Sequence, residues 1–273
     1  MGTKRGYSQV NVLFERLMRN LSLKVKIFLG AFLAVCAIVV IRLSMQNFYF
    51  FFIASEVVHA VGIIVLAYKL FALKTCSGLS LITQELTAIY LAARLSCSNL
   101  TLGNIHTLLD LISFLSTLLV IWMIRFRLKS SYIKELDNKR LYFLVVPVAI
   151  LAILIHPYTA NWNITRIVWA FSLYLESISV LPQLRFMQNA KMIETFTGYY
   201  VFALGVSRII ALAHWIIRIY LTRGAFLFMA GSGYFWFLAG FLAEIVQSFI
   251  LADFCYYYMK SFLQGQLLRK MPV

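Results

Sequence analysis

The chain has little charge, and above all little negative charge. Only 13% of its 273 residues are charged, and 10 Asp and Glu stand against 25 Lys and Arg. The chain is 62% hydrophobic, with a mean hydropathy of +0.84, whereas soluble domains are about 45–50% apolar and about 25% charged. A soluble protein of this composition could not cover itself with polar surface. Most of the chain is therefore expected to lie in lipid.

Signatures of catalysis and metal binding are also missing. The sequence contains no H-E-x-x-H, G-x-S-x-G, G-x-G-x-x-G or P-loop pattern. Its four histidines and four cysteines lack the spacing of metal ligands, and its last apolar segment has no lysine that could hold retinal. We expect no enzyme activity, no metal and no cofactor, and we interpret the cysteines as small buried apolar residues.

Eight apolar stretches approach the length that crosses a bilayer, about 20 residues with a range of roughly 17–25. They cover about 27–43, 48–70, 81–97, 105–124, 141–156, 165–184, 197–220 and 234–259. The first is short and could be a signal peptide or a signal anchor. The long basic region before it and the lack of a small-residue cleavage site favour an uncleaved helix.

The distribution of basic residues predicts the orientation of these spans. If the N-terminus is cytoplasmic and all eight segments cross, 19 of the 25 Lys and Arg lie on the cytoplasmic side and only Arg42, Arg166 and Arg223 lie at the opposite surface. Such an asymmetry follows the positive-inside rule and places both termini in the cytoplasm. The basic excess is thus an orientation signal, and no soluble domain remains to bind nucleic acid.

The predicted protein is an all-α polytopic membrane protein with three parts. Residues 1–47 form a basic segment with an extra hydrophobic helix, 48–259 a seven-helix core, and 260–273 a cytoplasmic tail. The start of the chain, 1–24, is either a basic amphipathic helix on membrane lipids or a solvated flank.

Charged residues inside the spans are the candidates for function, because each costs at least ~2.5–3.5 kcal/mol at the bilayer centre without a partner or a wet cavity. Two helices each carry an arginine and a tryptophan on one face. The residues selected by depth are Arg94, Arg166, Trp169, Trp215 and Arg218 in the lumenal third, and His59, Glu176 and Arg208 near the middle.

Two interpretations of these residues remain open. Single intramembrane charges can simply hold helices together, and tryptophan is common at membrane interfaces. The clustering of Arg and Trp at one depth instead indicates a cavity open to the lumen, with Glu176 and Arg208 as an ion pair at its floor. A cavity with arginines and aromatic walls suits an anionic ligand, above all a carboxylate.

The order of motifs carries a family resemblance over about residues 48–273. The runs are KTCSGLS from Lys74, LYFLVVP from Leu141, WAFSLYLES from Trp169, LPQL from Leu181, YVFALGVSR from Tyr200 and ADFCYYY from Ala252. This series resembles the ER lumen protein-retaining receptors, known as KDEL receptors. The extension before residue 48 resembles the plant-type receptor-like branch of that family.

The resemblance implies a fold and a function. The fold would be a seven-helix core akin to the SWEET and PQ-loop transporters, with two three-helix bundles that repeat in parallel. The function would be to bind escaped lumenal proteins by a C-terminal KDEL-like or HDEL-like signal in the Golgi and to return them to the endoplasmic reticulum in COPI-coated vesicles. Arg269 and Lys270 in the tail are either a coat signal or a plain basic flank.

Site residues follow from the resemblance position by position. His59 matches the family's pH-sensing histidine, and an imidazole titrates in the range between Golgi and ER pH. Arg94 and Arg218 match residues that bind the carboxylates of the signal, and Trp169 and Trp215 match aromatic residues of the same pocket. Glu176 and Arg208 match its mid-membrane polar pair.

Other positions depart from the family pattern. Phe52 replaces an arginine, Leu95 and Cys97 replace a tyrosine and an aspartate, Arg166 replaces a glutamate, Ser207 and Ala211 replace tyrosines, and Trp236 falls near an expected aspartate. Acidic groups for the lysine of a KDEL signal are mostly gone. We therefore expect an altered ligand, with an acidic or neutral group near Arg166.

Three functions remain as hypotheses at this point. The first is a receptor for a peptide C-terminus in the membranes of the endoplasmic reticulum and Golgi. The second is a PQ-loop-like transporter that carries a small anionic solute through the same cavity. The third is a scaffold derived from a receptor that has lost its ligand.

Overall fold

The computed structural model describes residues 49–98, 105–137, 141–158, 163–190, 195–228 and 234–263. These parts are helices joined by turns, and no strand occurs in them. The helices are α3 (Tyr49–Leu73), α4 (Leu81–Cys97), α5 (Ile105–Trp122), α6 (Tyr142–Leu154), α7 (Asn163–Ile178), α8 (Leu181–Asn189), α9 (Thr195–Leu221), α10 (Ala225–Phe228) and α11 (Trp236–Leu263). The predicted extra helix at 27–43 and the tail residues Arg269 and Lys270 lie outside the described residues.

Every apolar segment predicted from residue 48 onward is helical, and most ends agree within a few residues. Five helical stretches in the described residues are long and apolar enough to cross a membrane: Phe50–Leu73, Ile105–Arg127, Asn163–Asn189, Thr197–Leu221 and Trp236–Tyr258. Helix α6 is apolar but has only 13 residues, and α4 has 17. The described part of the chain is therefore all-α, and several of its helices are long and apolar enough to span a membrane.

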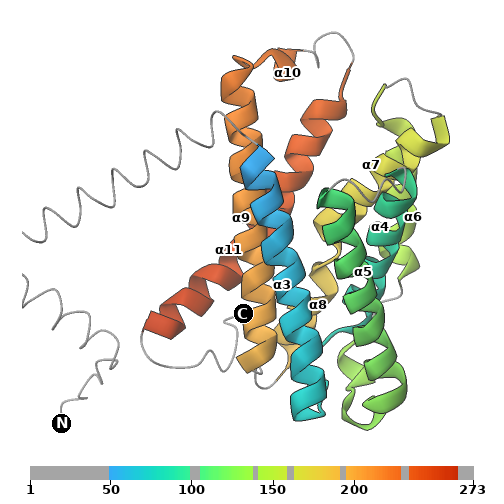
Figure 1. The fold of residues 1–273 in the computed structure, drawn as a ribbon, viewed down its shortest axis with the longest axis vertical. Coiled ribbons are helices and arrows are strands. Elements are labelled where there is room, and N and C mark those ends of the chain that lie inside the picture. Colours follow the sequence, from blue (N-terminus) through green and yellow to red (C-terminus); the bar gives the residue numbers. More distant parts are fainter. Residues whose placement is uncertain are drawn as a thin grey trace, which may run out of the picture.

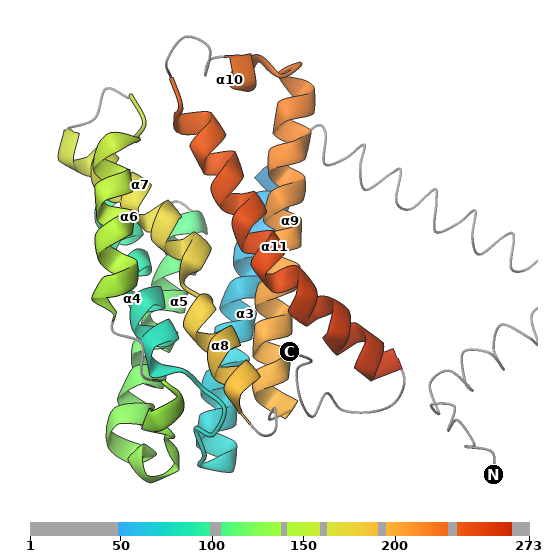
Figure 2. The same cartoon turned by 180° about the vertical axis from the view of Figure 1, so that it is seen from behind.

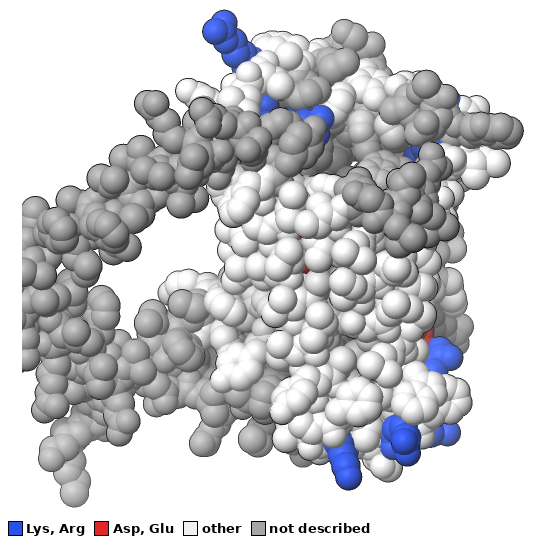
Figure 3. Space-filling model, in the orientation of Figure 1, with Lys and Arg blue, Asp and Glu red and all other residues white. Residues whose placement is uncertain are grey.

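The helices form two neighbouring groups (Figures 1 and 2). Helices α3, α9 and α11 lie on one side, α4, α5, α6 and α7 lie on the other, and α8 lies between them near the end where α3 finishes. Figure 3 shows the outer face that results: basic side chains gather at its two ends, and the broad band between them is almost free of them. A band of this kind suits the hydrocarbon core of a bilayer.

The segment predicted as one span at 165–184 is broken into α7 and α8. The break lies at Ser179 and Val180, just before Pro182, which has no N–H to continue the helical ladder. The backbone carbonyl of Glu176 accepts hydrogen bonds from the Ser179 hydroxyl at 2.9 Å and from Nε2 of Gln247 at 3.0 Å. Because Gln247 belongs to α11, its hydrogen bond to the Glu176 carbonyl also connects α11 to α7.

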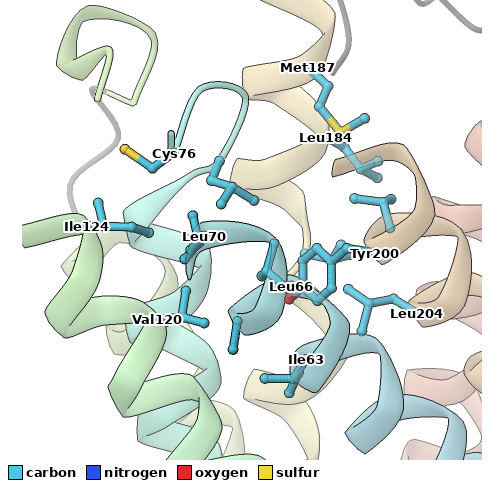
Figure 4. Packing of buried hydrophobic residues seen from close by; sticks show 14 of the residues in the cluster. Ile63, Leu66, Leu70, Cys76, Val120, Ile124, Leu184, Met187, Tyr200 and Leu204 are labelled. Atoms are coloured by element: carbon cyan, nitrogen blue, oxygen red, sulfur yellow. The ribbon is translucent and has the colours of Figure 1, made fainter. Parts of the chain in front are cut away.

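Beside the break, α8 holds the turn between α3 and α4. Gln183 is fully buried, donates from Nε2 to the carbonyl of Gly78 at 2.8 Å, and accepts from the N–H of Ser80 at 2.9 Å. Gly78 has a φ of 84°, which a side chain would strain. A large apolar cluster packs next to this turn, with Leu70 of α3, Leu184 of α8 and Tyr200 of α9 among its members (Figure 4).

Buried Asp137 holds the other side of this turn. Its carboxylate accepts from the Ser80 hydroxyl at 2.8 Å, the N–H of Ile82 at 3.2 Å and the Tyr132 hydroxyl at 2.7 Å. Burial, helped by the hydrogen bond to Asp137, raises the pKa of Tyr132 above its ordinary value, so the hydroxyl remains a donor.

Helices α9 and α11 approach closely at glycines. A Cβ on Gly205 would overlap the Sγ of Cys255, and one on Gly198 would lie 2.9 Å from Cε2 of Tyr258. Towards the other end of the pair, a Cβ on Gly240 of α11 would lie 3.2 Å from Cη2 of Trp215. Small residues allow such close packing between membrane helices, so these contacts fix how far α11 is shifted along α9.

We predict that Gln183→Leu destabilises the protein. The change leaves the buried Gly78 carbonyl and Ser80 N–H without partners, at about 1–3 kcal/mol for each group, so the midpoint of thermal unfolding in detergent should fall by several degrees. Gln188→Leu is the matched control, because Gln188 lies exposed on the same helix. Equal midpoints for the two variants would contradict the role of Gln183.

Candidate functional site

A cavity of about 290 Å³ lies between the two helix groups, in the half of the bundle where α3 and α11 begin and α9 ends. Its outer end is at Phe52, Arg218 and Phe237, close to the helix ends, and its inner end is at His59 and Arg208, deep within α3 and α9. The structure brings seven of the predicted site residues to it: His59, Arg94, Trp169, Glu176, Arg208, Trp215 and Arg218.

Glu176 of α7 is the centre of a buried ionic cluster at the inner end. Arg208 of α9 donates from Nη2 to its Oε1 at 2.5 Å, and Arg94 of α4 donates from Nη1 to its Oε2 at 2.9 Å. The predicted pair of Glu176 and Arg208 is thus confirmed. The cluster joins α7 to α9 and α4, so it ties the two helix groups together.

Arg94 has a second acidic partner that the sequence did not reveal. Asp110 of α5 accepts from its Nε at 2.8 Å and from its Nη2 at 2.5 Å, in the bidentate geometry of strong Arg–carboxylate pairs. Three nitrogens of the guanidinium therefore donate to carboxylates within the protein. In this structure Arg94 lines the cavity, but its charge is already matched.

Two histidines also form contacts between helices of this region. His59 is buried, and its Nε2 lies 3.3 Å from the hydroxyl of Tyr90, which belongs to α4. His106 of α5 pairs with Glu56 of α3 through Nδ1 and Oε2 at 2.6 Å. Each contact crosses between the two groups of helices, so the histidines also help to set their spacing.

The outer part of the cavity is aromatic and basic. The guanidinium of Arg218 lies 5.8 Å from the ring centre of Trp215 and 5.7 Å from that of Phe237. Trp169 is 38% exposed and lines the same space, and Phe52 lies between the rings of His106 and His214. Arginine over aromatic faces keeps its charge while it is partly dehydrated, which suits contact with an anionic group.

Arg166 is the predicted site residue that the structure does not bring into the cavity. Its guanidinium donates to the side chain of Asn163, one turn earlier in α7, and lies 5.9 Å from the ring centre of Tyr158. The cavity-lining residues of α7 are Trp169 and positions further along the helix. Arg166 therefore does not line the cavity, and its position does not support the expectation that it selects an acidic or neutral group of the ligand.

Two acidic residues of the spans that charge and depth alone do not assign, Asp110 and Glu244, also belong to this region. Asp110 holds Arg94, and Glu244 of α11 lines the cavity. A sequence signal for Asp110 exists, because His106 and Asp110 are four residues apart and share one face of α5. No three His, Cys, Asp or Glu come together as a possible metal site within the described ranges.

We predict that Glu176→Gln strongly destabilises the protein. Loss of the shared charge leaves Arg208 and one side of Arg94 unbalanced, and removal of one partner from a buried ion pair costs about 3–5 kcal/mol. The free energy of unfolding in detergent measures this loss. Glu85→Gln is the control, because Glu85 pairs at 2.5 Å with Arg125, whose side chain is 53% exposed, and surface pairs contribute at most about 1 kcal/mol. Similar losses in both variants would show that the cluster has no special role.

Comparison with known proteins matches the sequence of this chain to one family. The family model described as ER lumen protein retaining receptor matches residues 75–218. The chain is 34% identical to ER lumen protein-retaining receptor B of Arabidopsis thaliana over 222 residues, which are 80% of this chain and 97% of that protein. It is 33% identical to the receptor of Petunia hybrida over 214 residues, 77% of this chain and 94% of the relative.

An animal relative shows the same extent of similarity. ER lumen protein-retaining receptor 3 of Xenopus laevis is 32% identical over 227 residues, which cover 82% of this chain and 99% of the relative. The family consists of receptors and not of enzymes. The chain belongs to the family of ER lumen protein-retaining receptors.

Proposed function

We propose that the chain is a retrieval receptor of the endoplasmic reticulum and Golgi membranes. It binds the C-terminal end of lumenal proteins in the cavity between the two helix groups and returns them from the Golgi in COPI-coated vesicles. The observation that carries the proposal is the cavity itself, which gathers seven of the residues that the family resemblance assigns to ligand binding or to the polar core.

The proposed architecture is a core of seven crossings with a SWEET-like arrangement. The crossings are α3, α4, α5, α6, the broken pair α7–α8, α9 and α11. The break before Pro182 supports a crossing that is made of two shorter helices. With the extra N-terminal helix the protein has eight spans and both termini in the cytoplasm, where Arg269 and Lys270 are available to the coat.

Roles within the cavity follow from charge and depth. Arg218, with Trp215 and Trp169 beside it, receives a carboxylate of the ligand at the outer end. His59 is the pH-sensing group, and Glu176 with Arg208 forms the polar floor. Arg94 contributes chiefly by holding α4, α5 and α7 in place, because Asp110 and Glu176 already accept from its guanidinium.

The ligand differs from a standard retention signal. A KDEL or HDEL tail carries two acidic side chains and a terminal carboxylate, whereas both inner arginines already donate to carboxylates of the protein. Phe52 and Leu95 add no charge, and the thiol of Cys97 donates to the carbonyl of Thr165. Such a tail therefore meets too few unmatched cations to bind tightly.

We predict weak or absent binding of KDEL and HDEL peptides to the purified full chain at pH 5.5–6. Isothermal titration calorimetry in detergent measures the affinity. A submicromolar dissociation constant for either peptide would contradict the altered pocket.

A screen of C-terminal peptide libraries at Golgi-like pH tests the receptor function directly. Saturable binding that is lost on amidation of the peptide carboxylate and weakened at least tenfold by Arg218→Gln is the expected result. Arg223→Gln is the matched control, because Arg223 lies just beyond the end of α9 and is not among the cavity-lining residues. Flux of a labelled small anion into proteoliposomes, with no peptide binding, would favour the transporter.

A further inference from the structure

A groove outside the candidate site opens between three helices at the opposite end of the bundle. It has a volume of about 670 Å³ and lies between the start of α6, helix α8 and the later part of α11. None of its lining residues is shared with the candidate site. Phe143 and Phe249 line it and are 63% and 80% exposed, so the groove opens on the outer surface. We call it the α8 groove, because α8 lies between the helix group that contains α6 and the group that contains α11 (Figure 2).

The lining of the α8 groove changes from apolar to charged along its length. Leu181 and Arg185 are four residues apart on α8, and Phe249 and Asp253 are four residues apart on α11. Residues at this spacing lie one above the other on one face of a helix. On each helix the charged residue is one turn closer to the C-terminal end. The groove therefore has an apolar part deeper in the bundle and one charge of each sign nearer to the end of the bundle.

Both charges lie close to the level where hydrocarbon meets polar headgroups. The apolar stretches that are long enough to cross a membrane end at Asn189 for the pair α7–α8 and at Tyr258 for α11. Arg185 and Asp253 are four and five residues before these ends, which corresponds to about 6–8 Å at 1.5 Å per residue. The apolar part of the groove lies one turn deeper, at the level of the lipid chains. The groove thus crosses the boundary between the two layers of the membrane.

The two charges have no partner within the described part of the chain. Arg185 and Asp253 are both exposed, and no ion pair or hydrogen bond joins either side chain to the other or to another described residue. A molecule with both a phosphate and an ammonium matches them, because guanidinium binds phosphate oxygens through two parallel hydrogen bonds and a carboxylate accepts from an ammonium. Zwitterionic phospholipids present these two groups at this level of the membrane, above apolar chains.

We infer that the α8 groove binds one phosphatidylethanolamine molecule. Its phosphate lies at Arg185, its ammonium lies at Asp253, and an acyl chain follows Leu181 and Phe249 into the apolar part. A lipid with only negative charge brings no cation to Asp253, and the trimethylammonium of a choline headgroup has no N–H to donate. Because the groove is separate from the candidate site, the inference goes beyond the proposed receptor function and does not depend on it.

Native mass spectrometry of the full chain in detergent tests the headgroup preference. The probes are dioleoyl phosphatidylethanolamine and dioleoyl phosphatidylglycerol, added in equal amounts to delipidated protein, so that only the headgroup differs. The variants are Arg185→Gln and Asp253→Asn, each of which removes one charge from the groove. Arg127→Gln is the matched control, because Arg127 is an exposed arginine beyond the end of α5 that does not line the groove.

The wild-type chain should retain one phosphatidylethanolamine at least fivefold more often than one phosphatidylglycerol. Asp253→Asn should remove this preference, Arg185→Gln should lower the retention of both lipids at least fivefold, and Arg127→Gln should behave as the wild type. Thermal unfolding without added lipid should be unaltered in all three variants, which shows that they are folded. Equal retention by the wild type and Arg185→Gln, or a preference that survives Asp253→Asn, would overturn the inference.

Photocrosslinking in vesicles locates the lipid and distinguishes other occupants. The full chain is placed in dioleoyl phosphatidylcholine with a small fraction of phosphatidylethanolamine that carries a diazirine in one acyl chain, and the adducts are mapped by mass spectrometry. Adducts should concentrate at Leu181 and Phe249 and should decrease with Arg185→Gln but not with Arg127→Gln. Adducts spread evenly over the exposed helix faces would indicate ordinary contact with the bilayer. If residues 27–43 or another segment of the chain fill the groove, no adduct forms there. Either result would contradict the inference.

Discussion

One carboxylate, that of Glu176, holds the two groups of helices together inside the membrane. It accepts from Arg208 in one group and from Arg94 in the other, and Asp110 completes the charge balance around Arg94. Buried charges are stable only when each has partners with good geometry, because the cost of dehydration is large. The positions of α4, α5, α7 and α9 therefore depend on one another through four side chains, and the cavity exists where these helices are held apart around them.

Most of the helical fold could be predicted from the sequence, because long apolar runs have one stable form in lipid. The break between α7 and α8 was missed, since hydropathy stays high across Ser179 and Val180 and the consequence of Pro182 depends on Gln247, which is remote in the sequence. The observed bounds of α4 agree with the apolar stretch predicted at 81–97, and in the structure the Ser80 side chain caps its first turn.

The sequence indicated which residues line the cavity better than it indicated how their charges are paired. Depth and helix face selected seven residues that line one cavity, but the electrostatic interpretation failed where partners came from other helices. From the sequence alone, Arg94 is expected to be available to an anionic ligand, but in the structure its guanidinium donates to Asp110. Arg166 is expected to line the cavity, but its guanidinium donates to Asn163 and lies beside the ring of Tyr158. A count of charges in sequence cannot reveal such pairings, because they depend on the rotation of each helix about its axis.

The close approach of α9 and α11 at Gly205, beside Cys255, and at Gly240, beside Trp215, has a consequence for the cavity. Helix α11 cannot shift along α9 by one turn without forcing a bulkier side chain against the Cys255 sulfur or the indole ring. The two glycines therefore fix the register of α11 against α9, and with it the positions of the α11 residues that line the cavity. A residue with a side chain at either position would push α11 away from α9 and change the shape of the cavity between them.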